Sequence, residues 1–172
     1  MTTAGALVAA LVAAVVAMLL GACAGEARDP ATADLDPATA MVEYRYNDSS
    51  VPPEYHRSYT ITVQEGEARM VVDSYGDELH DVTESVDDGV WSDLLARVGA
   101  LEVGGGRAPD GCSGGTSREM QATDAEHPAS DPAVRARAEV CGGEGDADAE
   151  AIDAAIKPVL ARFDTDELLA TG

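Results

Sequence analysis

RSYTITVQEGEARMVVDSYGDELHDVTESV, residues 57–86, contains the alternation and the turns that predict the architecture of this chain. From residue 57 to residue 64, apolar side chains alternate with hydroxyl-bearing ones, which is typical of a half-buried β-strand. Glu65-Gly66 and Tyr75-Gly76-Asp77 then predict tight turns, because glycine tolerates a positive φ. A similar alternation precedes this stretch. We therefore expect an antiparallel meander of four strands, at about residues 42–46, 57–64, 68–72 and 79–86.

The spacing of the apolar residues changes after residue 86 from every second position to a helical period. Asp87 and Asp88 can cap the start of a helix, and Gly104-Gly105-Gly106 ends it. The expected buried stripe consists of Val90, Trp91, Leu94, Leu95, Val98 and Leu101. The sequence therefore predicts a helix directly after the fourth strand.

The C-terminal half of the chain predicts a hairpin and a second helix. The last helix is expected at residues 147–163, where Pro158 should kink it or split it in two. The two strands of the hairpin are expected at about residues 118–123 and 134–140.

These elements predict an α+β architecture. We expect a mostly antiparallel sheet, made of the four-strand meander and a disulfide-closed hairpin, with two helices packed on one face. The expected single domain covers residues 41–165, and a flexible C-terminus follows at residues 166–172.

The N-terminal segment contains a motif that indicates where the protein is located. Leu20-Gly21-Ala22-Cys23 closes an apolar run that begins at Ala4 and contains no charged residue. It resembles the lipobox of bacterial lipoproteins, in which lipid is attached to the cysteine and the signal segment is removed just before it. The resemblance implies a signal peptide at residues 1–22, a lipidated (palmitate-bearing) Cys23, and a position at the extracytoplasmic face of the bacterial cell membrane.

Two features surround this motif. Residues 23–40 are expected to form the lipidated cysteine and a disordered tether, because they show no apolar periodicity and contain Asp-Pro-Ala-Thr-Ala twice. Met1-Thr2-Thr3 lacks the basic residues of a usual signal peptide. A mis-assigned start codon or an uncleaved membrane span therefore remain alternatives.

The three cysteines support an exported protein. If Cys23 carries lipid, Cys112 and Cys141 remain as a pair at the open end of the expected hairpin, in a compartment where disulfides persist. Closing this loop would stabilise the fold by roughly 3.5 kcal/mol in the chain-entropy model.

The charge of the chain excludes two classes of partner. The formal net charge is −21, and residues 1–22 contribute none of it. An acidic surface repels phosphates, so we expect no nucleic acid. It also repels an anionic bilayer, so we expect contact with the membrane only through the lipid anchor.

One short motif resembles an active site. Gly111-Cys112-Ser113-Gly114-Gly115 is similar to the Gly-Asp-Ser-Gly-Gly sequence around the nucleophile of chymotrypsin-like proteases. The resemblance implies a hydrolase in which Ser113 is the nucleophile and His56 the base. Cysteine replaces the aspartate here, however, and the chain is short for a double barrel. A glycine-rich turn beside a disulfide is the simpler interpretation, so we expect no catalytic residues.

The candidate metal ligands lack the spacing of a known site. His56, His80 and His127 do not form a zinc pattern, and we interpret them as solvent-exposed strand and loop histidines. Asp146, Asp148 and Glu150 resemble a calcium loop only superficially, because the glycine and terminal glutamate of the EF-hand are absent. Acids in the first turn of a helix are stabilised by its dipole. We expect no metal and no cofactor.

The tyrosines form the most informative cluster, because all five lie between positions 44 and 75. Tyrosine is frequent at recognition surfaces, where it buries a large area and keeps a polar tip. Prolines should stiffen the neighbouring Pro52–Arg57 loop. The candidate recognition surface consists of Pro52, Pro53, Tyr55, Tyr44, Tyr46 and Tyr59. Tyrosine is also a good strand residue, so packing beneath a helix is the alternative.

The sequence thus predicts a lipid-anchored, non-enzymatic module that binds a protein or a cell-envelope ligand. One alternative is an extracytoplasmic protease inhibitor that inserts the Pro52–Arg57 loop into its target. A hydrolase that uses Ser113 and His56 is less favoured.

Overall fold

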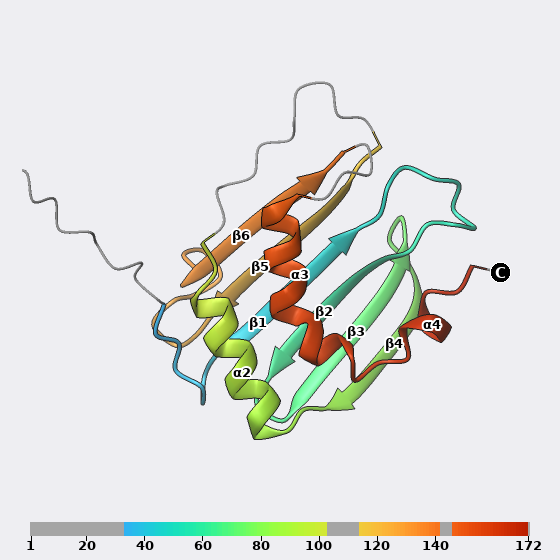
Figure 1. The fold of residues 1–172 in the computed structure, drawn as a ribbon. Helices are drawn as coiled ribbons and strands as arrows, with labels where there is room; N and C mark the ends of the chain where they lie inside the picture. The colour runs from blue at the N-terminus through green and yellow to red at the C-terminus, as the bar shows by residue number, and fades with distance from the viewer. Residues whose placement is uncertain (1–32, 103–113, 142–145, 172) are drawn as a thin grey trace, which may run out of the picture. The chain divides into compact units, whose positions relative to one another are not determined.

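One six-stranded sheet with two long helices on one face forms the core of the chain (Figure 1). The computed structural model describes residues 33–102, 114–141 and 146–171. The α+β class and the placement of both long helices on one face are confirmed. The elements are β1 (Met41–Asn47), β2 (Ser58–Gln64), β3 (Glu67–Ser74), β4 (Asp77–Ser85), α2 (Asp88–Gly99), β5 (Thr116–Thr123), β6 (Val134–Val140), α3 (Ala147–Leu160) and α4 (Thr165–Leu168).

The strands lie in the order β4-β3-β2-β1-β5-β6, and every neighbouring pair is antiparallel. The meander β1–β4 and the hairpin β5–β6 are both present as expected. The sequence did not predict that β5 would pair with the free side of β1. Between β4 and β5 the chain passes through α2, which lies over the sheet (Figure 1). The two predicted units therefore form one continuous sheet.

Strand register places the apolar residues on the face that the helices cover. Tyr44 lies opposite Ile61 on β2 and Met120 on β5, and all three are buried. Each large side chain removed from water in this way contributes about 2 kcal/mol of gross driving force. The helices cover this face with Trp91, Leu94, Val98, Ile152, Ile156 and Val159.

The helix ends follow local capping rules. Asp87 caps α2 by accepting a hydrogen bond from the backbone N–H of Val90 at 3.0 Å, as expected. Asp146 caps α3 in the same way. The last helix ends at Leu160 instead of residue 163, and Pro158 does not split it in two. Pro158 lies in the last turn, where its missing N–H removes a hydrogen bond only near the end of the helix.

Residues 33–40 are part of the domain, so the predicted tether is wrong for them. Leu35 and Ala40 are buried in the core. The N–H of Ala33 donates to the carbonyl of Gly99 at 3.1 Å, and the indole N–H of Trp91 donates to the carbonyl of Pro37 at 3.2 Å. These contacts join residues that are far apart in the sequence. They therefore require no periodic pattern of apolar residues within residues 33–40.

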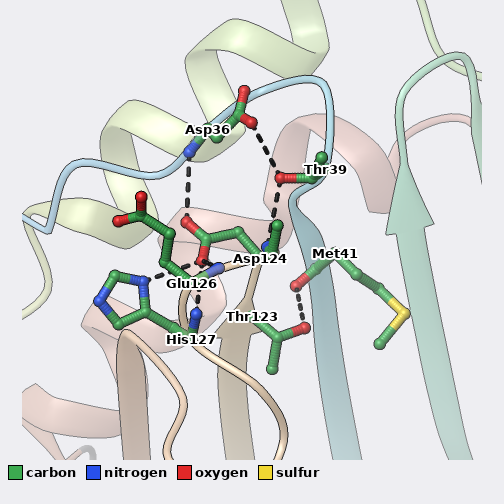
Figure 2. A network of polar contacts seen from close by, with 8 residues as sticks. Asp36, Thr39, Met41, Thr123, Asp124, Glu126 and His127 are labelled. Carbon is green, nitrogen blue, oxygen red and sulfur yellow. Dashed lines mark hydrogen bonds and ion pairs between the residues drawn. The ribbon is translucent and has the colours of Figure 1, made fainter.

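A polar network holds the same segment against the end of β5 (Figure 2). The carboxylate of Asp124 accepts hydrogen bonds from the backbone N–H groups of Asp36, Glu126 and His127 and lies 2.9 Å from the His127 ring. Burial raises the pKa of Asp124, but these hydrogen bonds outweigh it and leave the pKa below its usual range. The hydrogen bonds of Asp124 thus connect the start of the domain to the β5–β6 connection.

The C-terminal segment is also ordered, which corrects the prediction of a flexible end for residues 166–171. Leu168 of α4 is buried. The guanidinium of Arg57 donates to the carbonyl of Ala170 through Nε at 3.2 Å and Nη2 at 3.0 Å. The C-terminal segment is therefore tied to the start of β2.

The contact between α2 and the start of the domain predicts a specific defect. A Cβ atom at Gly99 would lie 2.7 Å from the backbone oxygen of Ala33, closer than packing allows. We expect Gly99→Ala to lower the free energy of unfolding by about 1–3 kcal/mol, measured by urea denaturation. Gly89→Ala in the same helix is the control, since its Cβ would meet only the Asp87 side chain at 3.3 Å. Equal stability of the two variants would contradict the close contact.

Candidate functional site

Three tyrosines form an aromatic cluster on the helix-facing side of the sheet. Tyr46 on β1 lies opposite Tyr59 on β2, and their stacked rings have centroids 5.2 Å apart. The ring of Tyr44, one row further along β1, lies 5.9 Å from that of Tyr59. Tyr44 and Tyr59 are 2% and 7% exposed, whereas Tyr46 is half-buried. The alternative of packing beneath a helix therefore holds for Tyr44 and Tyr59.

Two charged side chains complete this cluster. Asp153 on α3 accepts a hydrogen bond from the Tyr44 hydroxyl at 2.8 Å and another from Arg118 Nε at 3.1 Å. The guanidinium carbon of Arg118, which comes from β5, lies 4.9 Å from the centroid of the Tyr46 ring. The cluster thus joins β1, β5 and α3 through one carboxylate.

A cavity of about 290 Å³ lies beside the cluster. We call it the tyrosine pocket, and its lining residues are Tyr44, Tyr46, Tyr59, Arg118, Asp153, Ile156, Lys157 and Leu160. Lys157 is exposed and forms no ion pair with any residue in the described ranges. An aromatic and aliphatic hollow with a few convergent polar groups is the usual composition of a small-ligand site.

The chemistry of the pocket is set by neutral phenols. Burial raises the pKa of Tyr44 far above its ordinary value, and the neighbouring Tyr59 and Asp153 raise it further. Burial also raises the pKa of Tyr46 and of Tyr59. The three hydroxyls therefore stay protonated at physiological pH and act as hydrogen-bond donors and acceptors.

The predicted Pro52–Arg57 loop lies beyond the end of β1 and is firmly braced. The imidazole of His56 stacks on the ring of Tyr75 from the β3–β4 turn, with centroids 3.9 Å apart. The Tyr75 hydroxyl donates to the carbonyl of Val51, and Ser74 Oγ donates to that of Pro53 at 2.9 Å. The two connections therefore support each other as one unit.

Two tyrosines of this unit face the solvent. Tyr55 is 54% exposed and Tyr75 is 57% exposed. Tyr75 also has a φ of 54°, which a bulky residue rarely adopts and which costs of order 1–3 kcal/mol. We call Pro52, Pro53, Tyr55 and Tyr75 the loop tip. The predicted recognition surface is therefore divided between this loop tip and the tyrosine pocket.

The histidines are not all exposed, which corrects part of the prediction. His56 is buried, with Nδ1 3.3 Å from the Tyr75 backbone nitrogen and Nε2 3.3 Å from Ser58 Oγ. Both ring nitrogens are engaged, so His56 braces the loop and would have to leave these partners to act as a base. His80 is exposed on β4, and His127 contacts Asp124.

Several predicted residues lie outside the described ranges. These are Cys23, Cys112 and Ser113, together with the signal segment, so the lipid anchor stays a prediction and the Ser113 hydrolase stays a less favoured alternative. Cys141 is described and follows directly after β6. Within the described ranges, no helix is long and apolar enough to cross a bilayer, and no three acidic, histidine or cysteine side chains group as metal ligands.

No local pattern identifies Arg118, Asp153 or Lys157 as members of the pocket. The first lies on β5 and the other two on α3, and no motif connects them to the tyrosines. Their proximity depends on the pairing of β5 with β1. The alternation of apolar and polar residues in β5 assigns Arg118 to one face of the strand. It does not show which other elements lie on that face.

Comparison with known proteins gives no relative. No protein-family model matches the chain, and no curated protein and no solved structure shows significant similarity to it. Its function must therefore be inferred from the chemistry of the loop tip and the tyrosine pocket.

The buried tyrosines predict an alkaline unfolding transition. The unfolded chain ionises its tyrosines near pH 10, whereas the folded cluster keeps its protons to higher pH. The contribution of these tyrosines to the free energy of unfolding should therefore be constant below about pH 10 and be lost above it. The tyrosinate absorbance of the three cluster tyrosines and the circular dichroism should change together, and Tyr44→Phe should make the loss shallower. Tyr55→Phe is the exposed control. Ionisation of more than two of the five tyrosines before the loss of circular dichroism would contradict the burial of the cluster.

Proposed function

We propose that this chain is a lipid-anchored extracytoplasmic protein whose domain is a non-enzymatic binding module for a protein or a cell-envelope ligand. The observation that carries the proposal is the loop tip, where two exposed tyrosines stand on a braced support. Aromatic side chains of this kind dominate binding energy at interfaces. A support that is already rigid loses little conformational entropy on binding.

The tyrosine pocket supports the same proposal. The loop tip and the pocket lie at one end of the sheet, since Tyr46 is followed in the chain by the β1–β2 connection. The pocket offers Arg118 and Lys157 to an anionic or hydroxyl-bearing group, and the aromatic rings to an apolar one. A cell-envelope ligand with both kinds of group fits this chemistry.

The lipid anchor is supported by the motif at residues 20–23. Ala33, the first described residue, lies ten positions after Cys23. Such a length of chain spans at most about 35 Å. A lipidated Cys23 would therefore hold the domain close to the membrane surface, and its ligand would be met there.

A disulfide between Cys112 and Cys141 belongs to this proposal. Thr116 pairs with Val140, so Cys141 lies at the open end of the β5–β6 hairpin. Cys112 precedes Thr116, the partner of Val140, by four residues in the sequence. The bridge would close the hairpin in an oxidising compartment.

A protease inhibitor is the second candidate function. The bracing of the Pro52–Arg57 loop by Ser74 and Tyr75 favours it, because a loop held in one conformation pays little entropy when it enters an active site. In this case the target would be an extracytoplasmic protease, and Tyr55 would be the inserted side chain.

Intact-mass analysis of the native protein tests the anchor and the disulfide together. After alkylation without reduction, we expect an acylated N-terminal Cys23 and no label on Cys112 or Cys141. Reduction should expose two thiols, those of Cys112 and Cys141, and Cys23→Ser should release the protein from membranes. An intact N-terminus without acyl mass would overturn the anchor, and labelling of both cysteines before reduction would overturn the bridge.

The binding role is tested with the loop tip. Lipidated wild type, Tyr55→Ala and Met41→Ala are each cross-linked in solubilised envelopes, and the partners are quantified by mass spectrometry. Met41 is the matched control, since it is an exposed apolar residue at the opposite end of β1. We expect Tyr55→Ala to reduce recovery of the specific partner by about tenfold and Met41→Ala to leave it unchanged.

The same experiment separates the candidates. Recovery of a secreted protease whose activity the wild-type chain slows would favour the inhibitor. An identical partner list for wild type and Tyr55→Ala would overturn recognition through the loop tip.

A further inference from the structure

Among the described strands, the two outermost ones differ greatly in their chemistry. β4 and β6 are the outermost strands, and no described strand lies beyond either (Figure 1). β4 carries four carboxylates and no cation other than His80 when protonated. It also contains an irregularity at Leu79, where the register with β3 shifts. Charges of one sign and bulges are the usual devices that prevent edge-to-edge pairing.

β6 has neither charges of a single sign nor a bulge. Its seven residues pair with β5 without a register shift, from Ala122↔Val134 to Thr116↔Val140. It contains no proline, and its inward residues are apolar: Val134, Ala136, Ala138 and Val140. Its outward residues are Arg135, Arg137 and Glu139. β6 is therefore the edge on which another strand can be added.

The charges of β6 leave one cation unmatched. Arg137 is paired with Glu119 at 3.3 Å and with Glu139 at 2.8 Å. Arg135 is exposed and makes neither an ion pair nor a hydrogen bond with any residue of the described ranges. The formal charges of these four side chains, two arginines and two glutamates, sum to zero. The formal net charge of the whole chain is −21. The β6 edge is thus a place where two copies can meet without net repulsion between the facing side chains.

We propose that β6 is a homodimer interface, in which the β6 strands of two copies pair antiparallel about a two-fold axis at Arg137. This register places Arg135 opposite Glu139 of the second copy, twice. It also places Val134 opposite Val140 and Ala136 opposite Ala138, so each apolar residue meets an apolar one. The Arg137 side chains of the two copies face each other. Each of them remains paired with Glu119 and Glu139 of its own copy, and these carboxylates reduce the repulsion between the two arginines. The helix-covered faces of both sheets then lie on the same side.

A reciprocal charge swap tests this register. Arg135→Glu alone places glutamate opposite glutamate, and Glu139→Arg alone places arginine opposite arginine. A mixed dimer of the two variants restores both opposite-charge pairs. Arg97→Glu is the control, since it changes the net charge by the same amount as Arg135→Glu but lies on α2 and not on β6.

Sedimentation velocity of the full chain in a nonionic detergent at physiological salt measures the outcome. We expect wild type and Arg97→Glu to dimerise with a Kd of about 1–100 µM. Each edge variant alone should dimerise about tenfold more weakly, and their equimolar mixture should regain the wild-type affinity. Recovery in the mixture also shows that both variants are folded.

Three results would overturn the proposal. The first is a wild-type chain that remains monomeric at the highest concentration reached. The second is a dimer that neither edge variant weakens, which would place the interface elsewhere. The third is a mixture that stays as weak as its components, which would exclude this register. None of these outcomes bears on the loop tip, so this proposal and the proposed function fail independently.

Discussion

β1 is hydrogen-bonded on both of its sides, and this pairing holds the two halves of the sheet together. β1 binds β2 along one side and β5 along the other, so it joins the meander to the hairpin. Its inward Tyr44 lies opposite Ile61 and Met120 and reaches Asp153 on α3. The surface that α2 and α3 cover exists only when both halves of the sheet are joined. The hydrophobic core and the strand order are therefore established together.

The pairing of β1 with β5 also forms the candidate site. Arg118 arrives on β5 and Asp153 on α3, and both meet tyrosines that belong to the first two strands. The loop tip lies beyond the same end of β1, braced by the turn that contains Tyr75. The proposed dimer edge is formed by β6, a strand that contributes no residue to the pocket. A ligand at the aromatic end and a second copy at β6 would thus use different parts of the domain.

Local patterns predicted the elements well and the irregular segments poorly. Asp87, the stripe through Leu94 and Val98, and the turn glycines are each read from neighbouring residues, and α2 and the meander formed as expected. Residues 33–40 and α4 were assigned to flexible ends because they are short and without period. Their order comes from contacts with α2, with Asp124 and with Arg57. For the site, the concentration of tyrosines predicted where aromatic rings would gather, but not which rings would be buried.

Periodicity alone indicates the α+β class, the six strands with their buried faces and the two long helices, because these properties depend on residues one to four positions apart. The tertiary structure is needed to show that β5 pairs with β1, that Tyr44 meets a carboxylate 109 residues away, and that β6 is left at an edge. These depend on which elements share a core. That choice is made by the summed burial of distant side chains, and no local pattern encodes it.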